Sequence, residues 1–352
     1  MALFGKKELV GLDIGSSSVK IMKLRESGGT YQVAKFGVEP LPQNVVVDGA
    51  IMDHSAVVEA IKAGFARLGI KERMVATSIE GHSIIVKKVI LPTTTPEDLE
   101  ESIQWEVEQY IPFEVKEVKI DFQVLGPLPD DPTRMDVLLV AAKNELVEDY
   151  VSVVKEAGLT PTIIDLDSIA LGNAFEACAG ISEAQIPMVV NVGANFMNII
   201  ILEEGVPLFT RDVLMGGSMY NHELQRNFGV SYDIAERMKK GEELEDFDPE
   251  RVDAILKNVS GIIATEVQRS HNFYAASFPD KHVTKIFLTG GASRSPFLRE
   301  MMEDKLGIGV ELFDPFDGLV YDESEVDGEM VKAYGPAASV VTGLAMRKPG
   351  DK

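Results

Sequence analysis

Apolar and polar residues follow the same order in two stretches of the chain, one near the N-terminus and one in the middle. Residues 9–24, LVGLDIGSSSVKIMKL, and residues 187–202, PMVVNVGANFMNIIIL, each hold an apolar run, a short turn with glycine and a second apolar run. When the two stretches are aligned, Asp13 of the first corresponds to Asn191 of the second. Each stretch predicts a β-hairpin with no helix between its strands. The repeat therefore predicts two halves that open alike.

A third strand and then helices are expected after each hairpin. Apolar runs at 30–37 and 206–214 predict the third strands. In the first half, Asp53 and Gly69 mark the start and end of a helix, since they are typical of an N-cap and a left-handed C-cap. Its apolar stripe has helical spacing and consists of Val57, Ile61, Phe65 and Leu68.

The segment between residues 82 and 166 predicts inserted material with the order strand, helix, strand, strand, helix, strand. The first inserted helix has Thr95 as its N-cap and Pro96 at its first position, and Pro112 is expected to stop it. Its apolar stripe is Leu99, Ile103, Val107 and Tyr110. The second helix is expected from Asn144 to Gly158, with an inward stripe of Leu146, Tyr150, Val153 and Val154.

The second half predicts its own insertion, which is helical and acidic and covers about residues 222–278. A short helix (SYDIAERMKKG) precedes the charged loop EELEDFDPE. A long amphipathic helix then begins at Asp248 and Pro249, with one face formed by Val252, Ile255, Val259 and Ile262. Strand 285–291 returns to the core, and AASVVTGLAMR predicts a closing helix.

The length of 352 residues, with 45% apolar and 26% charged residues, fits a folded chain with more than one core. The class is α/β, with two lobes and an insertion in each. We expect a first core subdomain (1–80, 160–185 and 334–352) with the insertion 81–159. The second core subdomain (186–221 and 279–333) carries the insertion 222–278.

The charge balance limits the partners. There are 34 basic and 56 acidic residues, so the net charge is −22, which repels nucleic acid and anionic bilayers. The single cysteine, Cys178, lies in an apolar stretch and predicts a buried thiol in a reducing cytoplasm. Five scattered histidines offer no Cys/His metal cluster. The N-terminus lacks a signal-peptide pattern, and no apolar run suits a membrane span.

The first turn carries the strongest chemical signal. Asp13-Ile14-Gly15-Ser16-Ser17-Ser18 is followed by Lys20. Backbone amides at Gly15, the three hydroxyls and the ammonium group would together form a phosphate cradle. Asp13, at a strand end, could then hold a hydrated Mg²⁺. An ordinary hairpin turn is the competing interpretation of this motif alone.

Three further glycine turns support a nucleotide site. They are Asn191-Val192-Gly193-Ala194-Asn195, Met215-Gly216-Gly217-Ser218 and LTGGASRSPF, which contains Gly290, Gly291 and Ser293. The last two precede predicted helices, and a helix N-terminus favours an anion. Simple connections between elements would explain each turn separately. Four such turns at strand ends, two of them related by duplication, favour nucleotide binding.

The order of these motifs resembles the actin, sugar-kinase and Hsp70 superfamily. Within it, the chain resembles FtsA and, more specifically, the type IV pilus assembly protein PilM family. The resemblance rests on LFGKKELVGLDIGSSSVKIMKL, LPTTTPEDLEESIQWEVEQYIPFE and EVQRSHNFYAAS, and it covers essentially the whole chain. It implies a two-lobed actin/Hsp70-like (duplicated ribonuclease H-like) ATPase fold with an FtsA-type inserted subdomain in the first lobe.

The resemblance also implies a role for each motif residue toward ATP or ADP with Mg²⁺. Asp13 would face the metal through water. Gly15, Ser16, Ser17, Ser18 and Lys20 would bind the β and γ phosphates, and Gly193 and Asn195 would bind them from the other side, beside Gly216 and Gly217. Glu236 would reach the ribose and Lys239 the adenine, with Gly290, Gly291 and Ser293 below the base. Spacing alone gives Glu236 and Lys239 as a solvated helix face.

Asn191 departs from the resemblance, because relatives usually carry aspartate in the second phosphate loop. The missing carboxylate would otherwise hold the metal or orient the attacking water. We therefore expect ATP binding with slow or negligible hydrolysis. Asp167 is the nearest candidate for polarising water, and a helix N-cap is its competing structural role.

The resemblance implies a cytoplasmic adaptor that docks the N-terminal tail of the inner-membrane protein PilN between the first lobe and its insertion. It would link the membrane complex to the pilus motor ATPases. Trp105, Tyr110, Ile111 and Phe113 could line that groove, although core packing suits Ile111 better. A small-molecule kinase or phosphatase and a filament-forming protein remain alternatives. The acidity, concentrated at 97–121, 242–250 and 311–329, favours basic partner surfaces.

Overall fold

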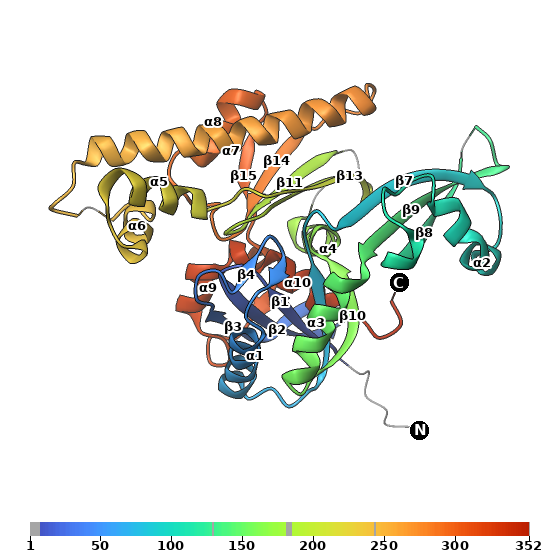
Figure 1. Ribbon diagram of the computed structural model, residues 1–352, viewed down its shortest axis with the longest axis horizontal. Coiled ribbons are helices and arrows are strands. Elements are labelled where there is room, and N and C mark those ends of the chain that lie inside the picture. Colours follow the sequence, from blue (N-terminus) through green and yellow to red (C-terminus); the bar gives the residue numbers. More distant parts are fainter. Residues whose placement is uncertain (1–7, 129, 181–184, 243, 352) are drawn as a thin grey trace.

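The structure is a computed structural model that describes residues 8–128, 130–180, 185–242 and 244–351 (Figure 1). Residues 3–7 of the opening motif, 181–184 of the first core range and Glu243 of the charged loop lie outside the described residues. Two sheets dominate, and a smaller three-stranded sheet projects to one side.

The first lobe is built on a six-stranded sheet with the order β10-β6-β1-β2-β3-β16. β1 runs antiparallel to β2 and parallel to β6, which confirms the first predicted hairpin. Helix α1 begins after Asp53, whose side chain accepts from the Ala56 amide, and ends at the left-handed Gly69, as expected. The bounds are β1 Val10–Ile14, β2 Ser18–Ser27, β3 Thr30–Pro40, β6 Met74–Ile79, β10 Thr160–Leu166, β16 Val320–Tyr321 and α1 His54–Leu68.

The second lobe repeats this arrangement in a five-stranded sheet with the order β13-β12-β11-β14-β15. β11 runs antiparallel to β12 and parallel to β14, so the second hairpin is confirmed as well. The bounds are β11 Pro187–Val192, β12 Met197–Glu203, β13 Val206–Val213, β14 Lys285–Thr289 and β15 Val310–Leu312. Short elements elsewhere are β4 Val46–Val47, β5 Ala50–Ile51, α8 Leu298–Leu306 and α9 Gly328–Tyr334.

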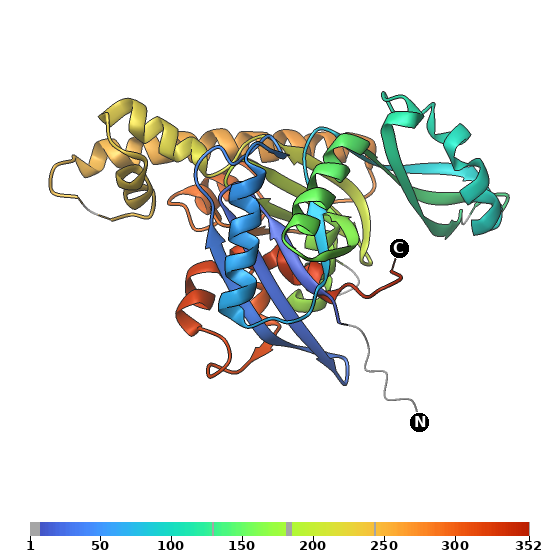
Figure 2. The ribbon, with the colours of Figure 1, turned by 60° about the horizontal axis from the view of Figure 1, so that its bottom comes forward.

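Two helices join the lobes, α4 (Asp167–Ala179) and α10 (Ser339–Met346). One face of α4 packs through Ala170 onto the first sheet and α10, and its opposite face packs through Leu171 and Phe175 onto the second sheet. Helices α1 and α3 (Asn144–Glu156) cover the outer face of the first sheet. The second sheet is covered on its outer face by α5 (Ser218–Phe228), α6 (Tyr232–Lys239), α7 (Pro249–Ser277) and α8. The layers are visible in Figure 2.

The first-lobe insertion is a sheet with the order β7-β9-β8 and the helix α2 on one face. The bounds are β7 Ile84–Pro92, α2 Pro96–Val107, β8 Val118–Pro127 and β9 Arg134–Lys143. Thr95 caps α2 as predicted, but the helix ends at Val107, before Tyr110 and Pro112. The Val107 carbonyl accepts from the amides of both Tyr110 and Ile111, so the chain closes in a tight turn there. Helix α3 packs against the first-lobe core.

The helices of the second lobe are α5 Ser218–Phe228, α6 Tyr232–Lys239 and α7 Pro249–Ser277. Asp248 caps α7 with Pro249 at its first turn, as predicted. The expected apolar face was wrong at Ile262, which is 40% exposed, whereas Ile263 is fully buried. The buried stripe runs through Leu256, Val259, Ile263 and Val267, and one residue turns the helix by about 100°.

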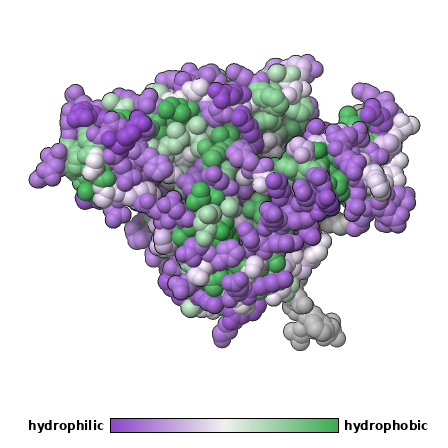
Figure 3. Space-filling view, in the orientation of Figure 1, coloured by the Kyte–Doolittle hydropathy of each residue, from purple (hydrophilic) through white to green (hydrophobic). Residues whose placement is uncertain are grey.

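No described helix combines the length and the apolar character that crossing a bilayer requires. Hydrophilic residues cover much of the face seen in Figure 3, including most of the insertion at the right.

Candidate functional site

The turns of the two hairpins face each other across a small cavity of about 50 Å³ between the lobes. Both repeats contribute, so the cavity exists only where the lobes meet. The first lobe lines it with Asp13, Gly15, Ser16, Ser17, Lys20, Glu80 and Asp167, and the second with Asn191, Gly193, Ala194, Phe196, Asn198 and Gly291.

Asp13 and Lys20 form an ion pair at this cavity. They lie opposite each other on β1 and β2, and Nζ of Lys20 is 2.8 Å from Oδ2 of Asp13. Their side chains are only 6% and 14% exposed. Burial by itself lowers the pKa of Lys20, but the Asp13 carboxylate, together with Asp167 and Glu80, outweighs burial and the pKa is raised. A charged lysine therefore stands at the cavity.

Two hydroxyl groups near the cavity have hydrogen-bonding capacity left over. The buried Oγ atoms of Ser16 and Ser293 find no partner within the part of the chain that the structure describes. A Cβ at Gly15 would lie 3.5 Å from Nζ of Lys20, so glycine keeps the space beside the ammonium group open. Unpaired donors beside a lysine fit an anion such as a phosphate group.

Three glycine turns of the second lobe contact one another beside the cavity. The Gly217 amide donates to the Gly193 carbonyl at 2.8 Å, and the Ala292 amide donates to the Val192 carbonyl at 2.9 Å. A Cβ at Gly217 would lie 2.9 Å from Cβ of Ala292 and 3.7 Å from Nζ of Lys239. The second phosphate loop, the 215–218 turn and the turn after β14 are therefore packed together. The left-handed φ of 95° at Gly290 suits glycine.

Glu236 and Lys239 lie on α6 and form a polar cluster with Asn221 of α5. Nζ of Lys239 is 2.5 Å from Oε2 of Glu236 and 3.1 Å from Oδ1 of Asn221. Nδ2 of Asn221 in turn donates to Glu236 at 2.8 Å. Burial by itself raises the pKa of Glu236, but Lys239, together with Asn221 and Lys240, outweighs burial and the pKa is lowered. Both side chains are held in place, in contrast to a freely solvated face.

Two carboxyl groups of the first lobe lie deep in the cavity. Asp167 is the first residue of α4, whose N-cap is Leu166, so the expected N-cap role for Asp167 is wrong. Burial, and next the nearby Asp13, raise the pKa of Asp167 to about 7. Burial, and next Asp167 and Asp212, raise the pKa of Glu80 well above its usual range. The protonation of these groups depends on what occupies the cavity.

The repeat places different chemistry in equivalent positions of the two hairpins. Asn191 and Asn198 lie opposite each other on β11 and β12, as Asp13 and Lys20 do on β1 and β2. Nδ2 of Asn191 donates to Oδ1 of Asn198 at 2.7 Å. The second lobe thus has a neutral amide pair where the first lobe has an ion pair.

Asn198 continues this amide pair into a link between the lobes. Its Nδ2 donates to Glu80 at 3.2 Å and to Asp212 at 3.0 Å. The other oxygen of Asp212 accepts from the Gly81 amide at 3.1 Å. Residues 80–82 lead directly into β7, so this link connects the second lobe to the root of the first-lobe insertion.

The family model described as type IV pilus assembly protein PilM matches residues 11–349. The chain belongs to the PilM family. The match covers both lobes and both insertions, and it confirms the family that the sequence motifs indicate.

Several proteins are similar to this family member over most of its length. Cell division protein FtsA of Streptococcus pneumoniae serotype 2 (strain D39 / NCTC 7466) is 23% identical over 355 aligned positions, covering 87% of this chain and 75% of FtsA. A solved PilM-PilN type IV pilus biogenesis complex is 24% identical and covers 97% of this chain and 99% of its own, with a TM-score of 0.85. MreB5 of Spiroplasma citri bound to ADP has 13% identity, 96% and 94% coverage and a TM-score of 0.51. The expected actin-like fold is confirmed.

The structure brings many of the predicted site residues together. Asp13, Gly15, Ser16, Ser17, Lys20, Asp167, Gly193 and Gly291 line the cavity. Ser18 begins β2 and is buried outside the lining, and Asn195 accepts a hydrogen bond from Ser218 in the 215–218 turn. Gly216, Gly217, Glu236, Lys239, Gly290 and Ser293 belong to the neighbouring turns and to the α5–α6 cluster.

Sequence reasoning missed Glu80, Asn198, Asp212 and Phe196. Glu80 directly follows the buried strand β6, as Asp13 ends the buried stretch of β1, and this was a usable signal. Asn198 is polar within a strand that is otherwise apolar up to Leu202. A buried amide in such a run predicts a specific partner.

Two other expectations concern residues outside the cavity. Ile111 is 7% exposed and packs in the core of the insertion, as expected, whereas Trp105 is 77% exposed. The half-buried Cys178 has a pKa raised to about 12 by burial, so its thiol is a poor nucleophile at neutral pH.

Proposed function

We propose that this type IV pilus assembly protein is a nucleotide-dependent adaptor that binds ATP or ADP between its lobes. The supporting observation is the cavity where both hairpin turns meet, with the Asp13–Lys20 ion pair and the unpaired hydroxyl of Ser16. In the solved neighbour MreB5, a protein of similar fold binds ADP.

The proposed roles follow from the donor set. Lys20, Ser16 and the amides of residues 16–17 and 194–195 would bind phosphate oxygens, because the amides of Gly15 and Gly193 already donate within their own turns. Lys239 and Glu236 would contact the nucleoside. Mg²⁺ would arrive with the nucleotide, with Asp13 holding one of its waters. A bound Mg²⁺ would supply charge neutralisation at the phosphates.

We infer that ATP hydrolysis is slow, because the second lobe offers no general base at Asn191 or Asn198. Asn191 uses its amide group on Asn198, and neither can act as a general base toward water. Asp167, with its raised pKa, remains the candidate for polarising water. A small-molecule kinase would need a base from the second lobe, so this observation favours the adaptor. Filament formation has no supporting observation here.

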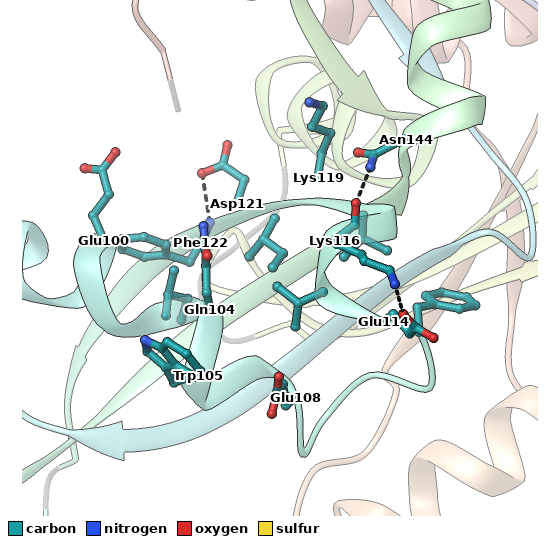
Figure 4. Close-up of a pocket in the computed structure, with 15 residues that line it drawn as sticks. Glu100, Gln104, Trp105, Glu108, Glu114, Lys116, Lys119, Asp121, Phe122 and Asn144 are labelled. Atoms are coloured by element: carbon teal, nitrogen blue, oxygen red, sulfur yellow. Dashed lines mark hydrogen bonds and ion pairs between the residues drawn. The ribbon is translucent and has the colours of Figure 1, made fainter.

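We infer further that the chain docks the N-terminal tail of PilN, as the solved PilM-PilN complex contains a protein of that name. The site expected is the boundary between the first lobe and its insertion. Of the residues expected to line the groove, Trp105 and Phe113 border a cavity of about 1010 Å³ in the insertion, which extends to Asn144 at the start of α3 (Figure 4). The partner complex would hold the chain at the cytoplasmic side of the inner membrane, beside the motor ATPases.

The proposal is tested by titrating Mg-ATP into the full chain by calorimetry. Saturable binding is expected, and Lys20→Ala should weaken it by about tenfold or more, since a buried charge-assisted contact to phosphate is lost. Lys23→Ala is the matched control, because Lys23 lies on the same strand but pairs with Glu72 at 2.6 Å, away from the cavity. A synthetic PilN tail peptide is titrated into the same preparations.

Each part of the proposal has its own contrary result. Mg-ATP affinity that Lys20→Ala leaves unchanged would remove the nucleotide site from this cavity. Failure of the tail peptide to bind, with normal ATP binding, would remove PilN docking alone. Tail binding that Trp105→Ala leaves intact would move the docking site away from the insertion cavity.

A further inference from the structure

The first lobe contains a cavity of about 200 Å³ that is separate from the cavity between the lobes. It is lined by α1, by residues 70 and 73 before β6, and by residues 157 and 159 between α3 and β10. Helices α1 and α3 lie side by side on this lobe (Figure 1, Figure 2). The two cavities share no lining residue, so a ligand bound here would leave the nucleotide site free.

The wall of this cavity is apolar. Ile61, Phe65, Ile70, Ala157 and Leu159 belong to the core of the first lobe, and each is at most 7% exposed. Among the described residues, no buried side-chain nitrogen or oxygen that lacks a hydrogen bond lies on this wall. A water molecule would find few partners there, and apolar cavities of this kind bind apolar molecules. Because close-packed cores have few voids larger than a water molecule, a space of this size favours an apolar ligand.

Two cationic side chains border the same cavity, Lys62 on α1 and Arg73 before β6. Neither forms an ion pair with another residue in the described part of the chain. Glu72, the sequence neighbour of Arg73, is already paired with Lys23 at 2.6 Å, and the described lining includes no carboxylate. In a chain with a net charge of −22, two unpaired cations at one cavity indicate an anionic group in its ligand.

We propose that this cavity binds a medium-chain aliphatic carboxylate. The hydrocarbon chain lies between α1 and the end of α3, and the carboxylate pairs with Arg73 and Lys62. Since an apolar cavity of about 150 Å³ holds one benzene molecule, a cavity of this volume suits a chain of about eight carbons. Binding stabilises the first lobe, because the ligand fills a space that only the folded chain forms. This site goes beyond the proposed adaptor function and does not depend on it.

The probe is sodium octanoate, titrated into the full chain below its micelle concentration. Methyl spectra of isoleucine follow the site, because Ile61 and Ile70 line the cavity while Ile286 lies in the core of the second lobe. Saturable shifts are expected for Ile61 and Ile70 and none for Ile286. Octylammonium has the same chain and the opposite charge, so it should bind at least about tenfold more weakly.

Two variants of α1 test where the chain of the ligand lies. Ala66 lines the cavity, and Ala66→Leu would fill part of it and should raise the dissociation constant of octanoate about tenfold. Ala63→Leu is the matched control, because Ala63 is an exposed alanine of the same helix outside the lining. It should leave octanoate binding unchanged.

A second set of variants tests the charged end. The double variant Lys62→Gln and Arg73→Gln should weaken octanoate binding about tenfold. It should leave the binding of octanol unchanged, because octanol has the same chain without the charge. This comparison checks the proposal even if Ala66→Leu folds poorly.

The proposal is overturned if octanoate causes no saturable shift, if octylammonium binds equally well, or if Ala66→Leu and the double variant both leave octanoate binding unchanged. Shifts of Ile61 and Ile70 caused by phosphatidylcholine vesicles would also overturn it and would assign the cavity to a membrane lipid. Lys20→Ala should not change octanoate binding, so failure of this site can be told apart from failure of the nucleotide site.

Discussion

Asp167 is a carboxyl group that the fold has removed from water without giving it a cation of its own. It lies at the start of α4, and Lys20 is paired with Asp13 at 2.8 Å. Burial and the nearby Asp13 raise the pKa of Asp167 from 3.8 to about 7. Burial of the charged form of Asp167 therefore carries an electrostatic cost that a bound Mg²⁺ would reduce.

This cost has a definite pH dependence. The folded protein binds the Asp167 proton more tightly than the unfolded chain, so stability falls as pH rises from about 4 to about 7 and stays lower above that. Asp167→Asn should therefore raise the unfolding free energy at pH 8 by roughly 1–3 kcal/mol and have little effect at pH 4. Melting curves of the nucleotide-free protein across this range measure the difference.

The control for this prediction is Asp280→Asn, which changes an exposed aspartate in the turn before β14. Its stability difference from the wild type should be small and flat with pH. An Asp167→Asn effect of the same size at every pH would contradict the explanation, because a role in packing alone does not depend on protonation.

The Asp13–Lys20 pair and the buried network were not equally predictable. Asp13 and Lys20 lie seven positions apart in a hairpin whose turn is visible in the sequence, so their register follows from local pattern. Asp212 lies opposite Asn198 in the β12–β13 hairpin, so their pairing is also local. Glu80, however, is 118 positions from Asn198. Its approach depends on how the two lobes pack, and no local spacing encodes that.

Helices α4 and α10 approach each other more closely than ordinary side chains allow. A Cβ at Gly343 in α10 would lie 1.8 Å from the Ala170 carbonyl oxygen in α4. Glycine is therefore required at the crossing of the two helices that join the lobes. The sequence predicts α10 from its apolar run, but the small residue that sets this distance has no periodicity to reveal it.

Substitution at this crossing should be costly. Gly343→Ala should lower the unfolding free energy by about 2–4 kcal/mol, because backbone atoms of both helices must move apart. Gly261→Ala is the matched control in α7, where a Cβ would meet no neighbouring atom within 4 Å. That change should stabilise the protein slightly, by up to about 1 kcal/mol, since alanine favours helices. Chemical denaturation of both variants measures the two effects, and equal values would contradict the packing argument.

The ends of the helices could be predicted from local sequence, whereas the buried face of α7 could not. The caps of α1, α2 and α7 were predicted from Asp53, Thr95 and Asp248, whose side chains act within their own turn. The choice of Ile263 over Ile262 depends on where the second sheet lies beneath α7. Both positions are isoleucine, so composition could not decide between them.

The two lobes and the first-lobe insertion share one polar connection. Asn198 of the second lobe lines the cavity between the lobes and donates to Asp212, and Asp212 accepts from the Gly81 amide at the root of the insertion. Phe196, which directly precedes β12, packs against His82 with ring centroids 6.2 Å apart. A change in the cavity is therefore placed to move the insertion. These contacts are a physical path by which nucleotide binding in the cavity could change partner binding at the insertion.

Such coupling must be reciprocal. If Mg-ATP changes the affinity for the PilN tail by about fivefold, the tail must change the affinity for Mg-ATP by the same factor. Asp212→Ala removes both hydrogen bonds to the insertion root and to Asn198 while leaving the cavity lining in place. It should bring the coupling factor close to one and leave each separate affinity nearly unchanged.

Glu204→Gln, at the exposed turn between β12 and β13, is the control and should keep the coupling. Calorimetric titrations of each ligand with and without the other measure the factor, and coupling that survives Asp212→Ala would mean that the lobes communicate through the packing of α4 and α10 instead.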